Sequence, residues 1–471
     1  MTISDDQGEP NPNAALEAVR GVDSLETAAK WLKARRIEDI ECVVPDQAGV
    51  ARGKMMPTRK FLSSPAFPMP STLFWQTITG AYPSEFIEEA DFDPADGDMV
   101  FTPDLSTLTV VPWESDPTAQ VMLDATNKDG SKVTVAPRQL LRHVVDLYAQ
   151  QGWRPIVAPE LEFYLVKPNT DPDYPLEPPI GRSGRPEVGR QGYSIAAINE
   201  FDDVIDDIYD FSEAQGLEID TLSHEDGAAQ MEINLAHGDP LALADQVFTF
   251  KRTIREAAMK HDIYATFMAK PMSNEPGSAM HIHQSVVDIE TGRNVFSDAD
   301  GAANDRFHSF IAGHQKYLPN VMCMLAPYVN SYRRLTRIST APINVHWGYD
   351  NRTVGLRVPD ADPQARRLEN RVPSSDANPY YAIAASLACG YLGMMKQLRP
   401  DAPIVGSARM MDFGLPRGLL EAVDLFKTCE PLAEIFGEDF MQVFSDIKLA
   451  EFETFMRVIS SWEREFLLLN V

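Results

Sequence analysis

The chain has 471 residues, 44% of them hydrophobic and 9% aromatic, which is ordinary for a globular protein and long enough for two domains. Its 69 acidic and 42 basic residues give a formal charge of −27. Nucleic acid and anionic membranes bind basic surfaces, so neither is expected as the main partner. The charge is compatible with a cationic small-molecule partner, or simply with an acidic cytoplasmic protein.

The sequence contains no feature that predicts secretion or a membrane span. Its four cysteines are scattered, without the spacing of a disulfide framework or a metal site. The acidic N-terminus differs from a signal peptide, and no stretch approaches about 18 apolar residues. We expect reduced cysteines, a cytoplasmic location and a mobile tail over residues 1–22.

A small mixed domain is predicted over residues 23–130. Ser24 begins a helical pattern with the character of a capping box, which runs to about Arg36. Three short β-rich stretches follow, separated by loops that contain proline and glycine: IECVVPD, TLTVVPW and AQVMLDA.

A larger domain is predicted over residues 131–471. Pro137 begins an amphipathic helix that Gly152 ends. Strand-like and helical segments then alternate, which predicts an α+β architecture with a sheet at its centre. Helices are predicted over 200–215, 240–261, 302–318, 376–397 and 417–469, strands at IVAPELEFYLV, QMEINL, YATFMAK, AMHIHQSV and TVGLRVP, and a long insertion loop over 168–192.

Polar side chains mark one face of four predicted strands. Residues two apart on a strand share a face, so Glu160 and Glu162 lie opposite Leu161. One such strand is common where a sheet faces water. The pattern recurs in three further strands, in the sets Glu232 and Asn234, His281, His283 and Ser285, and Glu369 and Arg371.

If these four strands converge, their carboxylates require a neutralising partner. A divalent cation is the simplest one, and carboxylates with a single imidazole suit Mg²⁺ or Mn²⁺ better than zinc. Glu225, seven residues before Glu232, is a candidate further ligand, with an ordinary surface glutamate as the alternative.

Arginines gather within about forty residues, which is unexpected in so acidic a chain. The guanidinium fork suits both carboxylate and phosphate, so one site for both is inferred, with structural ion pairs as the alternative. No Walker or Rossmann glycine motif is present, since GVARGK has the wrong spacing. The arginines are Arg333, Arg334, Arg352, Arg357, Arg366, Arg367 and Arg371.

Six blocks resemble, in order, the signature blocks of the glutamine synthetase family, most closely its bacterial type I branch. They are PELEF, HEDGAAQMEIN, GSAMHIHQS, NSYRRL, NRTVGLRVP and RRLENRVPSSDANPY, and the resemblance spans roughly 25–470. It implies a β-grasp-like N-terminal domain and a catalytic domain whose antiparallel sheet forms the active-site funnel. It also implies a dodecamer of two stacked hexamers, with active sites between subunits.

The resemblance further implies a reaction and its residues. ATP would phosphorylate the γ-carboxylate of glutamate, and an uncharged amine nitrogen would displace phosphate, with two to three Mg²⁺ or Mn²⁺ ions. One implied metal set is Glu162, Glu225 and Glu232, and the other is Glu160, His281 and Glu369. His283 and Ser285 match nucleotide positions, Arg352, Arg357 and Arg367 match phosphate-clamping positions, and Gly277, Arg334 and Arg371 match glutamate and phosphoryl positions.

Two departures from the family pattern concern the amine. The stretch that carries an ammonium-binding aspartate in the family reads LFWQTITGAYP here, with Trp75 or Gln76 at that position. The glutamate expected before Ala-Pro is Thr340. A desolvated ammonium ion needs anionic partners, whereas Trp75, Thr340 and Trp347 favour an amine with a carbon skeleton.

These departures resemble the γ-glutamylpolyamine or γ-glutamylputrescine synthetase-like branch. A ligase for a monoamine such as methylamine, isopropylamine or ethanolamine is one alternative, and a glutamine synthetase that uses ammonium is another. An inactive nitrogen-sensing homologue is a third, although all six implied metal ligands are present.

Overall fold

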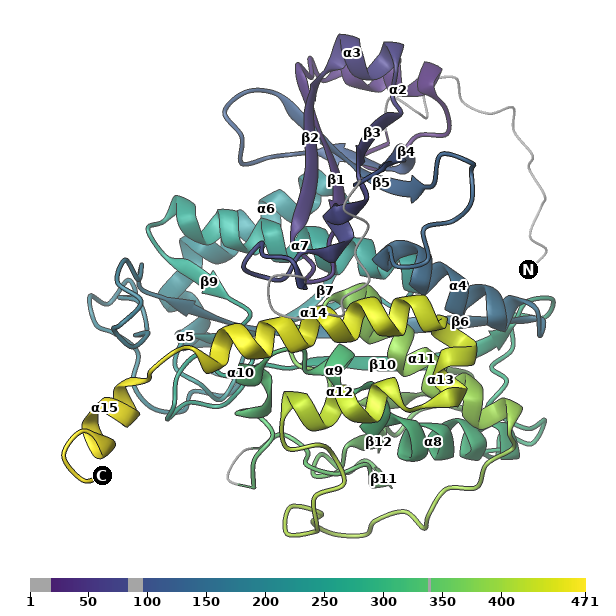
Figure 1. Ribbon diagram of the computed structural model, residues 1–471, viewed down its shortest axis with the longest axis vertical. Coiled ribbons are helices and arrows are strands. Elements are labelled where there is room, and N and C mark those ends of the chain that lie inside the picture. Colours follow the sequence, from purple (N-terminus) through teal and green to yellow (C-terminus); the bar gives the residue numbers. More distant parts are fainter. Residues whose placement is uncertain (1–17, 84–95, 338–339) are drawn as a thin grey trace.

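Two β-sheets organise the residues that the computed structural model describes, which are 18–83, 96–337 and 340–471. The five-stranded sheet lies at the top of Figure 1, and the eight-stranded sheet lies below it among most of the helices. Each sheet packs on a hydrophobic cluster of its own. This arrangement confirms the predicted α+β class.

The predicted tail over 1–22 lies outside the described residues as far as residue 17. Its remainder is bound to the small domain. The backbone N–H of Gly21 donates to Leu108 O at 2.8 Å, and Trp31 Nε1 donates to Ala18 O at 2.8 Å. The chain is therefore anchored from Ala18 onward, because these bonds satisfy polar groups at the edge of the small core.

The small sheet has the strand order β2-β1-β5-β4-β3, with β1 and β5 parallel at its centre. Ser24 caps the first helix, and Thr27 takes the reciprocal position of the capping box. The two strands that the sequence did not predict lie at the edges, where polar residues and proline are tolerated. The elements are α2 (Leu25–Ala34), β1 (Asp39–Pro45), β2 (Ala51–Pro57), α3 (Thr58–Ser63), β3 (Phe67–Pro70), η1 (Ser71–Trp75), β4 (Asp98–Val110) and β5 (Thr118–Thr126).

The large sheet has the strand order β11-β12-β13-β10-β6-β8-β7, and β9 pairs with β6 beside this path. Its pairs are antiparallel except for β11 and β12, which are parallel, so the expected antiparallel sheet is mixed at one edge. The strands are β6 (Trp153–Val166), β7 (Ile219–His224), β8 (Gln230–Leu235), β9 (Tyr264–Thr266), β10 (Met280–Asp288), β11 (Trp347–Tyr349), β12 (Leu356–Val358) and β13 (Leu368–Asn370).

Helices pack around this sheet, and the predicted helical region 417–469 is divided into four of them. Pro431 and Gly437, the latter with φ +84°, account for two of the breaks. The helices are α4 (Pro137–Ala149), α5 (Ile195–Ile198), η3 (Asn199–Phe201), α6 (Asp202–Gln215), α7 (Pro240–Lys260), α8 (Asp305–Tyr317), η4 (Leu318–Val321), α9 (Met322–Leu325), α10 (Val329–Tyr332), η5 (Pro363–Ala365), α11 (Pro379–Met395), α12 (Leu419–Lys427), α13 (Glu430–Phe436), α14 (Glu438–Met456) and α15 (Ser461–Leu467).

The buried helix α11 lies unusually close to α8. A Cβ on Gly313 would lie 2.1 Å from Cys389 O, and one on Gly393 would lie 2.1 Å from Ser309 O. Glycine at both positions therefore permits the two backbones to touch. Helix α11 begins directly after the chain segment that leaves β13, so its packing also anchors that segment.

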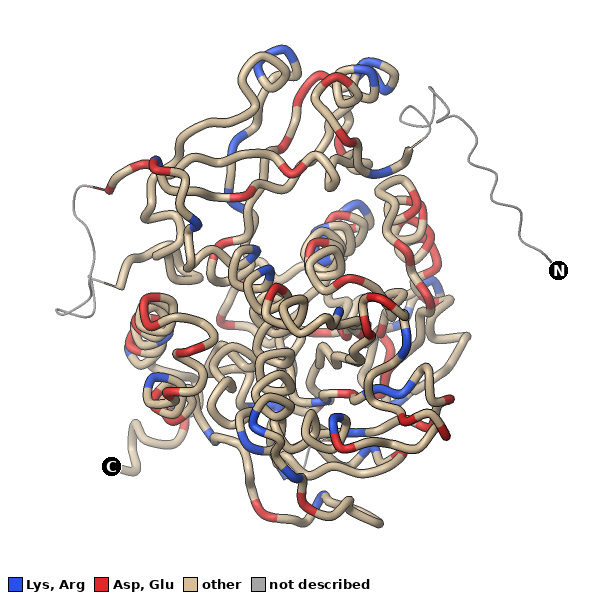
Figure 2. Tube along the Cα trace, turned by 90° about the vertical axis from the view of Figure 1, so that its right-hand side faces the viewer, with Lys and Arg blue, Asp and Glu red and all other residues tan. Residues whose placement is uncertain are grey.

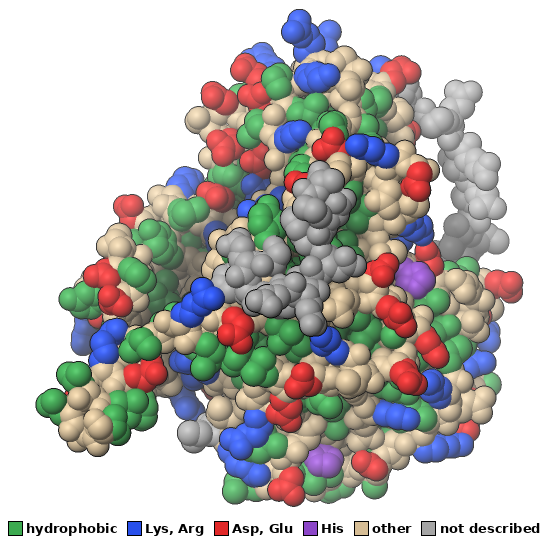
Figure 3. All heavy atoms as spheres, viewed as in Figure 1, with side chains coloured by type: hydrophobic (Ala, Val, Ile, Leu, Met, Phe, Trp, Pro, Cys, Tyr) green, Lys and Arg blue, Asp and Glu red, His purple; other side chains and the backbone are tan. Residues whose placement is uncertain are grey.

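Acidic and basic residues are interspersed along the chain trace in both the upper and the lower part of the molecule (Figure 2). Within the described ranges, no helix combines the length and apolarity needed to cross a bilayer. Helix α15 projects from the body (Figure 1), and hydrophobic side chains are visible on this projecting end (Figure 3). Trp462 is 61% exposed there.

The predicted domain boundary between residues 130 and 131 falls in the turn between β5 and α4. The small hydrophobic cluster extends past this point and includes Val133 and Ala136. We therefore keep the boundary as a proposal.

A buried arginine, Arg138 on α4, joins the small sheet to helix α7. Its guanidinium donates to both carboxylate oxygens of Asp245 on α7, at 2.9 and 2.8 Å. It also donates to Asp124 of β5 at 2.5 Å and to Asp104 of β4 at 2.9 Å. Burial lowers the pKa of Arg138, but Asp245 and Asp124 outweigh it and raise that pKa well above its usual value.

Replacing this arginine is expected to destabilise the fold strongly. Arg138→Ala leaves Asp245, whose side chain is 3% exposed, without its cation, and we expect a loss of about 3–5 kcal/mol in the free energy of unfolding. Arg142→Ala is the control, because Arg142 lies one turn later and binds Asp124 near the surface, where the loss should stay under about 1 kcal/mol. Urea unfolding of both variants measures the difference; equal losses would contradict the assignment.

Candidate active site

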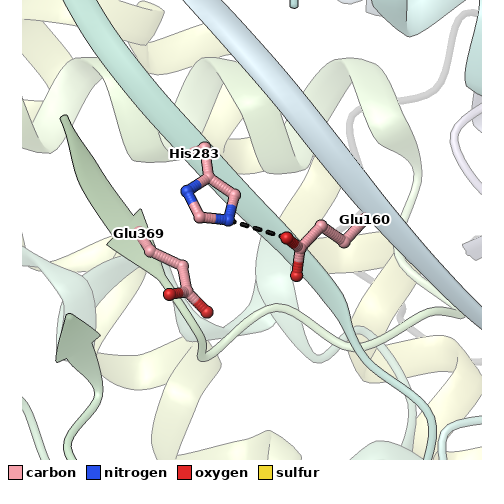
Figure 4. Close-up of side chains that lie close together, drawn as sticks. All are labelled: Glu160, His283 and Glu369. Atoms are coloured by element: carbon pink, nitrogen blue, oxygen red, sulfur yellow. Dashed lines mark hydrogen bonds and ion pairs between the residues drawn. The ribbon is translucent and has the colours of Figure 1, made fainter. Parts of the chain in front are cut away.

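Neighbouring strands of the large sheet bring the polar alternation of the sequence to one face. Residues directly opposite in antiparallel strands share a face. The register pairs Glu369 of β13 with His283 of β10, and His281 with Glu160 of β6. Figure 4 shows Glu160, His283 and Glu369 reaching toward one another from three strands. The same face continues to β8, where Glu232 lies opposite Glu162.

The described residues form three groups whose ligand atoms lie within 4.8 Å of one another. One is the implied set Glu162, Glu225 and Glu232. Glu225 follows β7 in a turn that its own N–H closes on Gln230 O at 2.8 Å. The other two groups share Glu160 and are Glu160, Glu232 and His281, and Glu160, His283 and Glu369.

The other implied metal set, Glu160, His281 and Glu369, also lies together, with His281 near both glutamates. Its Nδ1 lies 3.3 Å from Glu160 Oε2 and 3.9 Å from Glu369 Oε1. Burial and the nearby charge of Arg371 lower the pKa of His281 to about 4. The imidazole is therefore neutral at physiological pH, which is the form that binds metals.

The three carboxylates Glu162, Glu225 and Glu232 are poorly neutralised by the protein itself. Burial and, in addition, the negative charge of Glu225 raise the pKa of Glu162 to about 8. Burial and the negative charge of Glu160 raise the pKa of Glu232 to about 9. Burial also raises the pKa of Glu225. Three carboxyl groups of this kind, one buried and two half-buried, fit a hard divalent cation such as Mg²⁺ or Mn²⁺.

Glu160 and Glu369 are instead held ionised by protein groups. Burial would raise the pKa of Glu160, but hydrogen bonds from His281 and His283 lower it well below its usual range. Burial would likewise raise the pKa of Glu369, and Arg371 reverses this. The sheet face therefore has two electrostatically different halves.

The arginines around Glu369 have donors to spare. Arg357 donates to Glu369 Oε2 at 2.8 Å, and Arg371 donates to Oε1. Among the described residues, the Nε atoms of both arginines are buried and have no hydrogen-bond partner. Such donors suit the oxygens of a phosphoryl group.

The other predicted nucleotide-side residues differ in position. Arg367 Nε donates to His283 Nδ1 at 3.1 Å and so belongs to the site. Ser285 is half-buried on the same face, opposite Ile156 and beyond the end of β13. Arg352 is exposed in the turn between β11 and β12.

Arg366 fits the alternative that some of these arginines have a structural role. It donates to Ser297 Oγ at 2.6 Å and to Gly301 O at 2.9 Å, which is a structural role away from the carboxylates.

Arg334 and Gly277 form the other end of the site. Arg334 is 2% exposed and donates to the carbonyls of Val372 at 2.8 Å and Arg371 at 3.1 Å. Burial lowers its pKa to about 10, and Glu162 opposes this shift. A Cβ on Gly277 would lie 2.6 Å from Arg334 Cγ, so only glycine permits this approach.

One residue of the site escaped the sequence reasoning. Gln230 Nε2 donates to Gly277 O at 3.1 Å and lies 3.4 Å from Glu162 Oε2, so it orients a metal-ligand candidate. The signal was available, because Gln230 lies two residues before Glu232 on the same face of QMEINL.

The four residues predicted for the amine pocket are dispersed. Trp347 is 2% exposed, and its indole N–H donates to Asp401 O at 2.7 Å. It is packing at the sheet edge, and we remove it from the pocket. Trp75 and Gln76 lie in the small domain, where Gln76 donates to Tyr82 at 3.3 Å.

Thr340, by contrast, lines a cavity of about 1060 Å³. This cavity lies beside the chain that leads to Gly277 and Arg334. Three cationic residues, Arg190, Lys270 and Arg333, line it together with one acid among the described residues, Glu275.

Carboxylates suited to divalent cations, beside arginines with unused donors, define a metal-dependent phosphoryl-transfer site. A family model described as the glutamine synthetase catalytic domain matches residues 134–467. The chain belongs to the glutamine synthetase family. It is an ATP-dependent ligase of that type, and its family uses divalent metal ions, which the carboxylate groups described above fit.

Individual relatives resemble most of the chain. The γ-glutamylputrescine synthetase PuuA of Escherichia coli is 35% identical over 442 residues, which cover 92% of each chain. The glutamate–isopropylamine ligase of a Pseudomonas species is 32% identical over 442 residues, covering 92% of this chain and 95% of that relative. The solved structure of apo GmaS without ligand matches with a TM-score of 0.80 at 28% identity, covering 94% of this chain and 99% of that one.

The raised pKa values predict that the metal-free protein loses stability as pH rises. Between the unfolded pKa near 4.5 and the folded values of about 8 and 9, Glu162 and Glu232 hold protons in the native state that the unfolded chain has lost. The melting temperature without metal should therefore fall between pH 7 and 9, and Mn²⁺ should raise it most at pH 9.

The double variant Glu162→Gln and Glu232→Gln is the control, since it removes both titrations but leaves those of other groups, such as Lys251. The difference between wild type and variant isolates the two glutamates. If the difference in melting temperature between wild type and variant does not change between pH 7 and 9, the raised pKa values of Glu162 and Glu232 are contradicted.

Proposed function

We propose that this chain joins the γ-carboxylate of glutamate to an organic amine, with a polyamine or putrescine favoured, through a γ-glutamyl phosphate intermediate. The observation that carries the proposal is Thr340. This position lines the cavity beside the glutamate-side residues and offers a neutral hydroxyl where the family pattern has a carboxylate. Ammonium, once desolvated, would lack this anionic partner.

The relatives support an organic acceptor. Two of them are named as ligases for putrescine and isopropylamine, at 35% and 32% identity. The isopropylamine ligase favours a second candidate, in which the acceptor is a monoamine. Both candidates share the activation of glutamate and differ only in the amine.

The proposed chemistry has two balanced steps. A γ-carboxylate oxygen of glutamate attacks the terminal phosphorus of ATP, and ADP leaves. An uncharged amine nitrogen then attacks the acyl carbon, the bond from that carbon to the phosphate oxygen breaks, and inorganic phosphate leaves while the nitrogen loses one proton to the solvent. Divalent cations held by the two carboxylate sets would neutralise phosphoryl charge when bound.

The protein groups have separate proposed roles in these steps. Arg357 and Arg371 direct their unused Nε donors at the transferring phosphoryl oxygens. Arg334 and Gly277 form the place for the glutamate backbone. Burial of the site excludes water, which would hydrolyse an acyl phosphate before the amine arrives.

The charge of the cavity separates the routes of the two small substrates. Its three cations suit the two carboxylates of glutamate and would repel a polyamine. We therefore assign this cavity to glutamate, with Thr340 at the boundary where the amine arrives.

We also propose a homo-oligomer, a dodecamer of two stacked hexamers, with active sites between subunits. Trp75 and Gln76 lie in the small domain, and the neighbouring Ile78 N–H donates to Glu451 of α14 at 2.7 Å. In this proposal they line the amine side of a neighbouring subunit's site.

A panel of amines tests the function. Phosphate release is measured with glutamate, ATP, Mg²⁺ and, in turn, putrescine, spermidine, methylamine, isopropylamine, ethanolamine and ammonium. We expect the best organic amine to exceed ammonium at least about tenfold in kcat/KM. The Glu369→Ala variant is the blank and should lose activity, because it removes a carboxylate from the Glu160 and His281 set.

The outcomes separate the alternatives. A preference for ammonium identifies a glutamine synthetase and overturns the organic acceptor. Absence of turnover with every amine supports an inactive homologue and overturns the ligase.

Restoring the acid at the cavity should restore ammonium use. Thr340→Glu is expected to increase kcat/KM for ammonium about tenfold relative to the best organic amine, because it supplies an anionic partner. Thr336→Glu, at another residue lining the same cavity, controls for added charge alone. An equal change in both variants would show that position 340 has no special role.

A further inference from the structure

The chain between β13 and α11, residues 371–378, touches both halves of the site; we call it the connecting segment. Its first carbonyls receive the guanidinium of Arg334. Further along, Ser375 Oγ donates to the carbonyl of Glu162 at 2.5 Å, and Ser375 N–H donates to Ser278 O at 3.1 Å. A shift of this segment would move the glutamate-side arginine relative to the metal-side carboxylate.

A buried lysine from outside the site is bound to this segment. Lys251 on α7 is 8% exposed, and its Nζ donates to Ser375 O at 2.5 Å and to Ala377 O at 3.0 Å. The ammonium also lies 5.5 Å from the centre of the Phe267 ring. A buried lysine is rare because the loss of hydration is costly, and burial lowers the pKa of Lys251 to about 7.

The residue between these two carbonyls is a half-buried acid, Asp376. Its Oδ2 accepts a hydrogen bond from Ser331 Oγ at 2.8 Å, and its Oδ1 is buried without a partner among the described residues. Ser331 lies in α10, and its carbonyl receives the N–H of Arg334 at 3.2 Å. Asp376 thus connects the segment to the backbone that carries Arg334.

We propose that Lys251 and Asp376 are positioning residues that fix the connecting segment, and through it the placement of Arg334 relative to Glu162. Lys251 holds the two carbonyls on either side of residue 376, and Asp376 holds the turn before Arg334. Neither touches a substrate. The proposal rests on the proposed role of Arg334 in binding glutamate.

The geometry explains why position 251 carries a side chain that donates hydrogen bonds. An apolar side chain at position 251 would leave the carbonyls of Ser375 and Ala377 without their donor. The ammonium donates to both at once, so it sets their separation as well as satisfying them. Small displacements of substrate-binding groups affect reaction rates strongly, which makes this constraint relevant to catalysis.

The test compares Lys251→Met with Lys260→Met in the full chain. Both lysines lie on α7, but Lys260 is 56% exposed and pairs with Asp207 at the surface. For Lys251→Met we expect glutamate binding to weaken about tenfold, with ATP binding changed less than about twofold. Lys260→Met should leave both unchanged.

Binding is measured directly by calorimetry, glutamate in the presence of ADP and Mn²⁺, and ATP alone. These readouts do not need turnover, so an unproductive amine panel would refute the proposed reaction without deciding this proposal. Asp376→Asn should weaken glutamate binding as well, and the double variant should lose less than the sum of the two, because both residues act on one segment.

A purely structural role predicts another pattern. Lower melting temperature with unchanged affinity for glutamate in the folded fraction would overturn the proposal, as would equal weakening of glutamate and ATP. If Lys251→Met does not fold, Ser331→Ala replaces it, because it removes the hydroxyl that binds Asp376 and accepts the N–H of Tyr328, and leaves Lys251 in place. Glutamate binding should then weaken about threefold, and unchanged binding would equally overturn the proposal.

Discussion

The arrangement of the active site depends on the repulsion among carboxylates that lie together on one face of the large sheet. Glu160, Glu162 and Glu232 face the same side because opposite residues in antiparallel strands must do so. The protein stabilises the ionised carboxylates of one part of this face with hydrogen bonds from two histidines and with arginines, and it leaves the other part with raised pKa values. The uneven neutralisation separates an already charged half from a half that needs cations.

This division gives each half of the reaction its own surroundings. Around Glu369, guanidinium groups with unused Nε donors suit phosphoryl oxygens. At the other end, Gly277 permits Arg334 to lie against the backbone, close enough for the charge of Glu162 to affect its pKa. Because residues 371–378 touch both ends, the distance between them depends on how firmly that segment is held. The buried Lys251 and the half-buried Asp376 serve that purpose in our proposal.

Much of this site followed from local patterns. Alternation with period two identified five of the six metal-ligand candidates, all except Glu225, because a strand has only two faces and the opposite one is apolar. Predictions that depended on loops were less successful. Trp347 was predicted to line the amine pocket, but its side chain is buried at the sheet edge, where the indole N–H donates to Asp401 O. Arg366 and Arg367 are neighbours in sequence, yet one binds the loop at Ser297 and the other binds His283.

The sequence by itself determined which side chains face together on each strand, and the order of blocks that marks the glutamine synthetase family. These are local properties, set by backbone geometry and residue type. Only the tertiary structure decided which strands are neighbours, which carboxylates receive a histidine or an arginine, and that Lys251 reaches residues 375 and 377. The pairings of Glu160 with His281 and of Lys251 with Ser375 join residues more than a hundred positions apart, and they form because packing of the whole chain brings them into contact.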